Sequence, residues 1–225
     1  VVVPTTLNVA GVDQHGWQEW DVPRDWADKA RRQMTADQGM GCTPSWTCAP
    51  YQTEARPALG QQIAWGESSA VVFANSVLGA RTERYPDLLD ICAAITGRVP
   101  DVGLHRTENR AGQLLVRVTG LHPALLASDE LYPVLGHLVG RLAGDRVVVL
   151  DGLDTVPTED QLKSLGAAMA SSGAVALFHW VQANPHYTLS HSTPLPCYFL
   201  QCSIRVDPSF RLKPIRSNHF SQRRT

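Results

Sequence analysis

Arg146–His179, RVVVLDGLDTVPTEDQLKSLGAAMASSGAVALFH, is the stretch of sequence that decides the fold class. Its apolar run at 146–150 predicts a buried strand, and the Asp-Gly pair that follows predicts a turn. The segment 158–170 predicts a helix, because its opening Thr-Glu-Asp-Gln is similar to a capping box. The apolar segment 173–179 predicts a second buried strand. Strand, helix and strand in this order indicate a right-handed crossover unit, so we expect an α/β fold.

The residues before this unit continue the alternation of helices and strands. Trp26, Ala30 and Met34 are spaced by four and predict one face of a helix. The nearly all-apolar run at 70–75 predicts a buried helix, and the alternating, β-branched segment 113–119 predicts a strand. In chain order, the expected elements are short strands at 1–3 and 7–12, helices at 24–37, 63–78 and 85–96, the strand at 113–119 and a helix at 131–142.

Length and composition restrict the function. The chain has 225 residues, 44% hydrophobic and 18% charged, which predicts a globular protein with a core. Its formal net charge of −1 argues against a dedicated nucleic-acid binder. No apolar run reaches the ~18 residues of a membrane span, and no secretory signal is visible. The five cysteines are odd in number and low in density for a disulfide scaffold, so we expect free thiols in a reducing, cytoplasmic compartment.

The composition changes near residue 180. Residues 181–225 hold six basic residues and one acidic residue, and their Pro, Ser and His residues follow neither a helix nor a strand period. We therefore divide the chain into a domain at 1–180 and an irregular basic tail at 181–225, which we expect to be disordered or outside the domain. Translation of a retained intron is one origin for such a tail, and sequencing the transcript would test it.

Cys48 is expected in a loop, because it falls between Thr47 and the Pro-Tyr pair at 50–51. Three interpretations remain open: a small buried residue, a ligand of a metal or an iron–sulfur cluster, and a nucleophile. Cys42 lies six residues earlier, and a zinc module of Cys42, Cys48 and a histidine would lack paired-ligand spacing. Cys92 falls within an apolar helix and is expected in the core.

Two polar groups of residues flank the apolar run at the predicted buried helix. Glu67, Ser68 and Ser69 either cap its amino end or help to bind an anion there. At its other end, the amide of Asn75 must find hydrogen-bond partners among apolar neighbours. Arg81 offers a planar fork suited to a carboxylate or a phosphate. Structural and functional roles both remain open for these residues.

Further candidate groups are predicted in loops. Thr5 and Thr6 form either a polar turn or part of a site. His105 and Glu108 lie three residues apart, a spacing that fits a shared proton path and fits a solvated loop equally well. The glycines form neither a dinucleotide-binding nor a P-loop fingerprint, and the GxSxG and HExxH motifs are absent.

Five motifs together give the chain a specific signature. They are Val-Pro-Thr-Thr-Leu-Asn at 3–8, Thr-Cys-Ala-Pro-Tyr at 47–51, Gly-Glu-Ser-Ser-Ala-Val at 66–71, Phe-Ala-Asn-Ser-Val-Leu-Gly-Ala-Arg-Thr at 73–82 and Thr-Gly-Arg-Val-Pro at 96–100. In this order they resemble the large-subunit domain of the aconitase X family, over residues 1–180. The resemblance implies the three-layer α/β core of the aconitase superfamily, here incomplete, followed by the irregular tail.

The resemblance also implies an activity, that of a hydro-lyase with an iron–sulfur centre acting on a small hydroxy acid such as cis-3-hydroxy-L-proline. Removing water from a 3-hydroxy acid needs a Lewis acid on the leaving hydroxyl and a base at the α carbon. Cys48 would be one of about three thiolate ligands, and the family's small swivelling domain or subunit would be a partner. The implied site residues are Ser68, Ser69, His105 and Glu108 for catalysis, and Thr5, Thr6, Asn75, Ser76 and Arg81 for substrate binding.

The chain departs from the family pattern after His179. The family's later Gly-Cys-Pro-His and Asp-Thr-Cys motifs are absent, and Cys197 and Cys202 match neither. We therefore expect a truncated member with little activity as an isolated chain. Two rival readings remain. One is a phosphomevalonate dehydratase large subunit, whose phosphate substrate should require more basic residues near Arg81 than Arg84 alone. The other is a non-catalytic fragment that at most binds a partner subunit.

Overall fold

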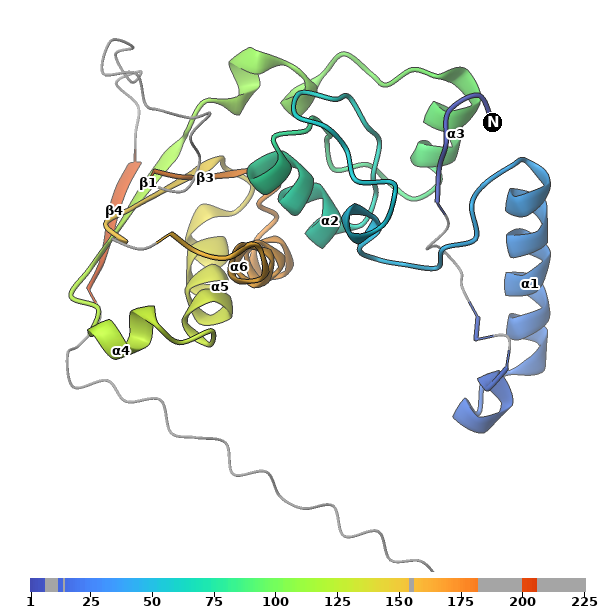
Figure 1. Cartoon of the computed structure of the whole chain (residues 1–225), viewed down its shortest axis with the longest axis horizontal. Helices are drawn as coiled ribbons and strands as arrows, with labels where there is room; N and C mark the ends of the chain where they lie inside the picture. The colour runs from blue at the N-terminus through green and yellow to red at the C-terminus, as the bar shows by residue number, and fades with distance from the viewer. Residues whose placement is uncertain (7–11, 14, 154–155, 182–199, 206–225) are drawn as a thin grey trace, which may run out of the picture.

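The computed structural model describes residues 1–6, 12–13, 15–153, 156–181 and 200–205. It contains a small parallel β-sheet with helices packed on it, and an amino-terminal half of short helices joined by loops (Figure 1). The expected α/β class is confirmed. The two halves meet where α2, Ser68–Phe73, packs against α6, Glu159–Ser172. In the part of the chain that the structure describes, no helix is both long and apolar enough to cross a membrane.

Within the described residues, four parallel strands form the sheet. Their spatial order is β3 (Phe178–Trp180), β2 (Val148–Asp151), β1 (Leu114–Thr119) and β4 (Leu200–Arg205). Along β1, Leu114, Val116 and Val118 are buried, whereas Arg117 and Thr119 are exposed. Parallel sheets are usually covered on both faces. On the face that carries Arg117 and Thr119, Val149 of β2 is buried, so this face is exposed only in part.

The main core lies between the buried face of the sheet and two helices, α5 (Leu131–Ala143) and α6. Short α4, Pro123–Leu126, precedes α5. The helices α5 and α6 approach closely, because Gly136 and Gly140 of α5 lie against the backbone of α6. Core side chains include Val116, Val118, Leu150 and Phe178 of the strands, Leu135, Val139, Leu165 and Met169 of these helices, and Val72 of α2.

The amino-terminal half contains the long helix α1, Arg24–Gly39, and several short elements, and the sequence motifs lie outside α1. The helix α3, Leu89–Thr96, is followed by Gly97. The φ of Gly97 is 65°, a left-handed conformation that glycine adopts readily. The elements are η1 (Trp17–Trp20), α1 (Arg24–Gly39), η2 (Pro50–Gln52), α2, the π turn η3 (Ala74–Leu78), α3 (Leu89–Thr96), η4 (Gly103–His105) and η5 (Thr107–Arg110).

Several predicted helices are confirmed to within a few residues: those at 24–37, 131–142 and 158–170 correspond to α1, α5 and α6. The capping box at α6 is present, since the Thr158 hydroxyl accepts from the Gln161 amide and the Gln161 side chain accepts from the Thr158 amide. The predictions at 63–78 and 85–96 start too early, because α2 begins at Ser68 and α3 at Leu89. Likewise, only the last residues of the strand predicted at 173–179 join β3.

Three local predictions are wrong. Cys92 is exposed. The buried face of α3 carries Ala94 instead. Trp26 is 46% exposed, because the buried stripe of α1 runs through Ala27 instead. Val1–Val3 form no strand; the amides of Val2 and Val3 both donate to the carbonyl oxygen of Ala94. The strand predicted at 7–12 lies almost wholly outside the described residues.

Residues 200–205 require a correction to the expected irregular tail. They form β4, which pairs in parallel with β1 along its whole length. Their sequence, Leu-Gln-Cys-Ser-Ile-Arg, alternates apolar and polar residues, which is the period of a strand. The edge of β1 supplies the backbone groups with which they pair. Apart from Val181 and β4, the tail lies outside the described residues.

Candidate active site

The amino end of α2 is capped by Glu67. Its Oε1 accepts from the Ser69 amide at 3.0 Å and its Oε2 from the Ala70 amide at 2.6 Å. A carboxylate at this position satisfies free N–H groups and interacts favourably with the helix dipole. Ser68 is exposed and Ser69 is partly buried, so their hydroxyls lie at the helix end without forming the cap. Their catalytic role stays a prediction.

We expect Glu67→Ala to lower the free energy of unfolding by about 1–2 kcal/mol, because two backbone donors lose a charged acceptor. Urea denaturation measures the change. Ser68→Ala is the matched control, with an expected change below about 0.5 kcal/mol because its side chain is exposed. Equal losses in the two variants would contradict the assignment of the cap to Glu67.

The loop that carries Cys48 is held against α2. Tyr51 is buried and stacks on Phe73, with ring centroids 4.1 Å apart. Burial raises the pKa of Tyr51 to about 12, with smaller contributions from nearby charges that include Glu67 and Cys48. Further along the loop, Arg56 donates two hydrogen bonds, of 3.3 and 2.7 Å, to the carboxylate of Glu159. The Cys48 side chain itself is exposed and is not in a disulfide.

These residues do not by themselves fit an iron–sulfur cluster. Within the described ranges, no three His, Cys, Asp or Glu side chains are grouped so that they could hold a metal ion. A cluster usually has three or four thiolate ligands. Cys42 is buried, which raises the pKa of its thiol, and Cys92 is exposed on α3. Cys48 therefore remains a single candidate ligand, and the zinc module of Cys42 and Cys48 gains no support.

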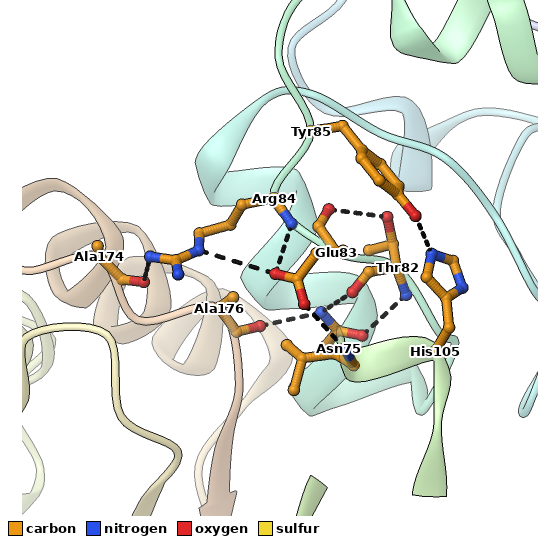
Figure 2. Close-up of polar contacts among 9 residues, drawn as sticks. Asn75, Thr82, Glu83, Arg84, Tyr85, His105, Ala174 and Ala176 are labelled. Atoms are coloured by element: carbon orange, nitrogen blue, oxygen red, sulfur yellow. Dashed lines mark hydrogen bonds and ion pairs between the residues drawn. The ribbon is translucent and has the colours of Figure 1, made fainter. Parts of the chain in front are cut away.

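Asn75 is fully buried in the π turn that follows α2 (Figure 2). Its Nδ2 donates to the carbonyl oxygens of Thr82 and Ala176, at 2.9 and 3.0 Å. Its Oδ1 accepts from the Thr82 amide at 3.1 Å and from Arg110 Nη1 at 2.9 Å. Two donors and two acceptor sites are the full capacity of an amide side chain. In this conformation Asn75 joins three segments of the protein and keeps no hydrogen bond for a substrate.

Arg110 and Ser76 complete this buried network. The Arg110 side chain also donates to the carbonyl oxygens of Asn75, at 2.9 Å, and Leu104, at 3.0 Å. The Ser76 hydroxyl accepts from the Phe178 amide at 2.9 Å. The π turn is thereby fixed both to the η4–η5 segment and to the start of β3. A direct substrate contact by Asn75 or Ser76 stays a prediction, beside this visible structural role.

Arg81 and His105 lie together beyond the π turn. Arg81 donates to the His105 carbonyl oxygen at 2.9 Å and to the Thr107 hydroxyl at 3.0 Å. The ring nitrogens of buried His105 contact the Tyr85 hydroxyl and Gln62 Oε1, each at 2.5 Å (Figure 2 shows the Tyr85 contact). Gln62 Oε1 is an acceptor, so Nδ1 of His105 donates to it and Nε2 accepts the phenolic proton. This pattern fits a neutral His105 imidazole that accepts a hydrogen bond from the Tyr85 hydroxyl.

Burial sets the charge states of this pair. Burial lowers the pKa of His105; the Glu83 carboxylate opposes this change, and the Arg110 and Arg81 guanidinium groups add to it. Burial also raises the pKa of Tyr85 to about 12, with a further increase from Glu83. The phenol is therefore protonated and the imidazole neutral near pH 7, and both shifts keep the proton on the Tyr85 oxygen.

We expect the protein to lose stability as the pH falls below about 6.5. Burial also lowers the pKa of His179, so at both His105 and His179 the unfolded chain binds protons more readily than the folded chain. Their contribution is complete above the unfolded pKa and is lost as the pH falls through the lower folded values. Urea midpoints between about pH 7.5 and 5 would measure it. His105→Gln should flatten the dependence and replacement of exposed His137 should not; parallel curves for the two variants would contradict the prediction.

A cleft of about 410 Å³ opens beside this network, at the amino ends of β1, β2 and β3. On its wall, Glu83 accepts from the amides of Arg84 and Leu104, at 2.8 and 2.9 Å, and Arg84 donates to the Ala174 carbonyl oxygen (Figure 2). The predicted catalytic residue Glu108 lines the same cleft and is exposed. A backbone hydrogen bond, followed by the charge of Arg106, lowers the pKa of Glu108.

The predicted site residues therefore fall into separate groups. Ser68 and Ser69 lie at the amino end of α2, and Cys48 lies in the loop held against this helix. Arg81, His105 and Glu108 lie beyond the π turn at its other end. Thr5 and Thr6 belong to neither group, since the Thr5 carbonyl oxygen accepts from the Thr43 amide and Thr6 bridges to Thr43.

Sequence reasoning missed four contributors to the network: Gln62, Glu83, Tyr85 and Arg110. Tyr85 and Gln62 lie 20 and 43 positions from His105, and no motif spacing connects residues so far apart. Arg110 carried a weak signal, because an arginine next to a predicted strand is unremarkable until its burial is known.

Fold and motifs together define an α/β protein whose motif-bearing helix, α2, packs beside a parallel sheet. The model of the aconitase X first domain matches residues 1–108, and that of the aconitase X second domain matches residues 112–197. The chain belongs to the aconitase X family. The boundary between the two models lies inside the segment 1–180 that the sequence predicts as one unit, and the second model extends into the predicted tail.

Individual relatives are similar over most of this chain. The cis-3-hydroxy-L-proline dehydratases of Hypocrea jecorina and Pseudomonas aeruginosa are 48% and 45% identical to it, over 82% of this chain and 31% and 32% of theirs. The phosphomevalonate dehydratase large subunit of Methanothermobacter thermautotrophicus is 43% identical, over 83% of this chain and 45% of that protein. The crystal structure of Thermococcus kodakaraensis aconitase X in its holo-form superposes with a TM-score of 0.71 and 35% identity, over 84% of this chain and 46% of that one. This chain thus spans about a third of the length of the two hydroxyproline dehydratases.

Proposed function

We propose that this chain is the two-domain part of an aconitase X hydro-lyase that removes water from a small hydroxy acid such as cis-3-hydroxy-L-proline. The observation that carries the proposal is its 48% and 45% identity, over 82% of the chain, to two cis-3-hydroxy-L-proline dehydratases. The reaction is proposed for the assembled enzyme, with the small swivelling domain or subunit as partner, in a reducing, cytoplasmic compartment.

The proposed roles follow the two groups of residues. Elimination of water needs a base for the proton on carbon and an acid or Lewis acid for the leaving hydroxyl. Arg81 is partly exposed and would bind the substrate carboxylate through its guanidinium group. The hydrogen bond from the Tyr85 hydroxyl to His105 would hold this phenol in one orientation beside the substrate. Ser68, Ser69 and Glu108 are proposed as further catalytic groups; Thr5, Thr6, Asn75 and Ser76 are proposed as further substrate contacts.

The iron–sulfur cluster enters this proposal through family membership. Cys48 is the proposed ligand from this chain, because its thiol is exposed and its loop is held by Tyr51 and Arg56. The remaining ligands would come from outside the described residues. A bound cluster would supply the Lewis acid for the leaving hydroxyl.

A second candidate is the large subunit of a phosphomevalonate dehydratase, which the 43% identity to the Methanothermobacter protein favours. A phosphate substrate carries more charge than a carboxylate and calls for several basic groups. Arg81 already donates to His105 and Thr107, and Arg84 donates to Ala174. The two bonds of Arg81 use two of its five N–H groups and leave donors for one carboxylate, so we favour the hydroxy acid without a phosphate.

The test is a chimera in which this chain replaces the matched segment of the Pseudomonas dehydratase. We expect turnover of cis-3-hydroxy-L-proline and little turnover of phosphomevalonate. Cys48→Ser should reduce the activity more than about 100-fold, whereas Cys92→Ser, which removes another exposed thiol, should leave it unchanged. A folded chimera without activity on either substrate would overturn the proposal and favour a non-catalytic fragment.

A further inference from the structure

The α1 arm, which we define as η1 and α1 (Trp17–Gly39), stands away from the sheet, α5 and α6 (Figure 1). Its buried side chains form a cluster that is separate from the main core. The members of this cluster are Val12, Trp17, Ala27, Ala30 and Met34, with Val22 packed against them. All of them come from one short stretch of chain, so this cluster is local among the residues that the structure describes.

Two tryptophans of the α1 arm are exposed. Trp20 is 77% exposed and Trp26 is 46% exposed. Trp26 precedes buried Ala27 and lies one turn before buried Ala30, so its indole ring adjoins the buried stripe of the helix. Large aromatic side chains are the commonest anchors of protein interfaces, because each one buries a large apolar area.

Some of the charges of the α1 arm are paired within it. Arg24 and Arg31 lie within 3.9 and 3.2 Å of Asp28, and Lys29 lies 3.5 Å from Asp25. The arm thus presents a balanced polar face, which does not suit a strongly charged partner such as nucleic acid. Trp20 and Trp26 are its exposed aromatic side chains.

The relatives point to one occupant for this surface. The matched region makes up 31% of the Hypocrea dehydratase and 45% of the Methanothermobacter large subunit, so each relative carries further polypeptide. A helix supported only by a local cluster is marginally stable, and packing against another part of a protein is the usual remedy. We propose that Trp20 and Trp26 dock the α1 arm onto an apolar surface of the aconitase X polypeptide that lies outside the first two domains. The expected docking depends on membership of the aconitase X family and not on dehydratase activity.

The test mixes the full chain with the Hypocrea dehydratase polypeptide from which the 186 matched residues have been removed. Sedimentation should detect a complex, and amide exchange in Arg24–Gly39 should slow by at least about tenfold on binding. Trp20→Ser and Trp26→Gln should each weaken binding by at least about tenfold. Glutamine is chosen at 26 because it keeps the helix propensity. Val134→Ser is the matched control, since Val134 is 49% exposed on α5, and it should bind like the unchanged chain.

Three results would overturn the inference. The first is no complex with the unchanged chain. The second is a complex that Val134→Ser weakens as much as the tryptophan variants do, or one that slows exchange elsewhere but not in α1. The third is self-association of the chain alone that Trp20→Ser abolishes, which would assign this surface to a second copy. A dehydratase assay plays no part in these readouts, so an inactive enzyme does not affect them.

Discussion

Replacing Asn75 with alanine is expected to lower the free energy of unfolding by about 3–5 kcal/mol, a loss typical of a broken buried polar network. The amide of Asn75 is fully buried and makes four hydrogen bonds, to the Thr82 amide and carbonyl, the Ala176 carbonyl and Arg110. Alanine would leave all four partner groups buried without that bond. The guanidinium group of Arg110 would be the costliest of them, because it is charged. Urea denaturation at neutral pH measures the loss.

The matched control for this prediction is Asn109→Ala. Asn109 is exposed and its side chain donates to the Gly103 carbonyl oxygen at 2.9 Å, so its replacement should cost less than about 1 kcal/mol. Asn75→Asp provides a further check, because it keeps the acceptor for Arg110 and loses both donors to carbonyl oxygens. A stable Asn75→Ala protein, with a midpoint equal to that of Asn109→Ala, would show that the network does not hold the π turn.

Gly136→Ala is expected to lower the free energy of unfolding by about 2–3 kcal/mol, although alanine favours helices. A methyl group at residue 136 would meet the Leu165 carbonyl oxygen and would lie 2.9 Å from the Ala168 Cβ. Neither atom is the end of a flexible side chain, so α5 and α6 would have to move apart. Because these helices cover the buried face of the sheet, the strain would reach the main core. Thermal or urea unfolding would measure it.

Gly39→Ala is the control, for which the expected change in the free energy of unfolding has the opposite sign. Gly39 closes α1, and a methyl group there would meet no atom within 4 Å. Alanine should therefore stabilise the chain by up to about 1 kcal/mol, through helix propensity and a less flexible unfolded state. If Gly136→Ala also stabilised the chain, the close approach of α5 and α6 would be refuted.

Local sequence signals predicted the regular elements of the carboxyl-terminal half well. The helix at 158–170 carries its own start signal in the capping box, and the strand at 113–119 carries its period. Local sequence signals were weaker in predicting which face of a helix is buried and which is exposed. The face of α3 that carries Cys92 and the face of α1 that carries Trp26 both depend on what lies beside the helix, which composition does not reveal.

The candidate site shows the same division between near and distant residues. Glu67, Ser68 and Ser69 were recognised as one end of a helix, because a cap depends on residues within one turn. Asn75 was recognised as a buried amide in need of partners. Its partners Arg110 and Ala176 lie 35 and 101 positions away, and pairings over such distances follow from chain folding.

The sequence by itself determined the α/β class, most helix positions and, through five ordered motifs, membership of the aconitase X family. Only the tertiary structure decided which polar residues face one another. It made Asn75 the centre of a saturated network, gave His105 the phenol of Tyr85 as a partner, and left Trp20 and Trp26 on an isolated arm. The physical reason is one of range. Propensity, capping and periodicity act over a few residues, whereas burial and hydrogen-bond partners are set by contacts between segments far apart in the chain.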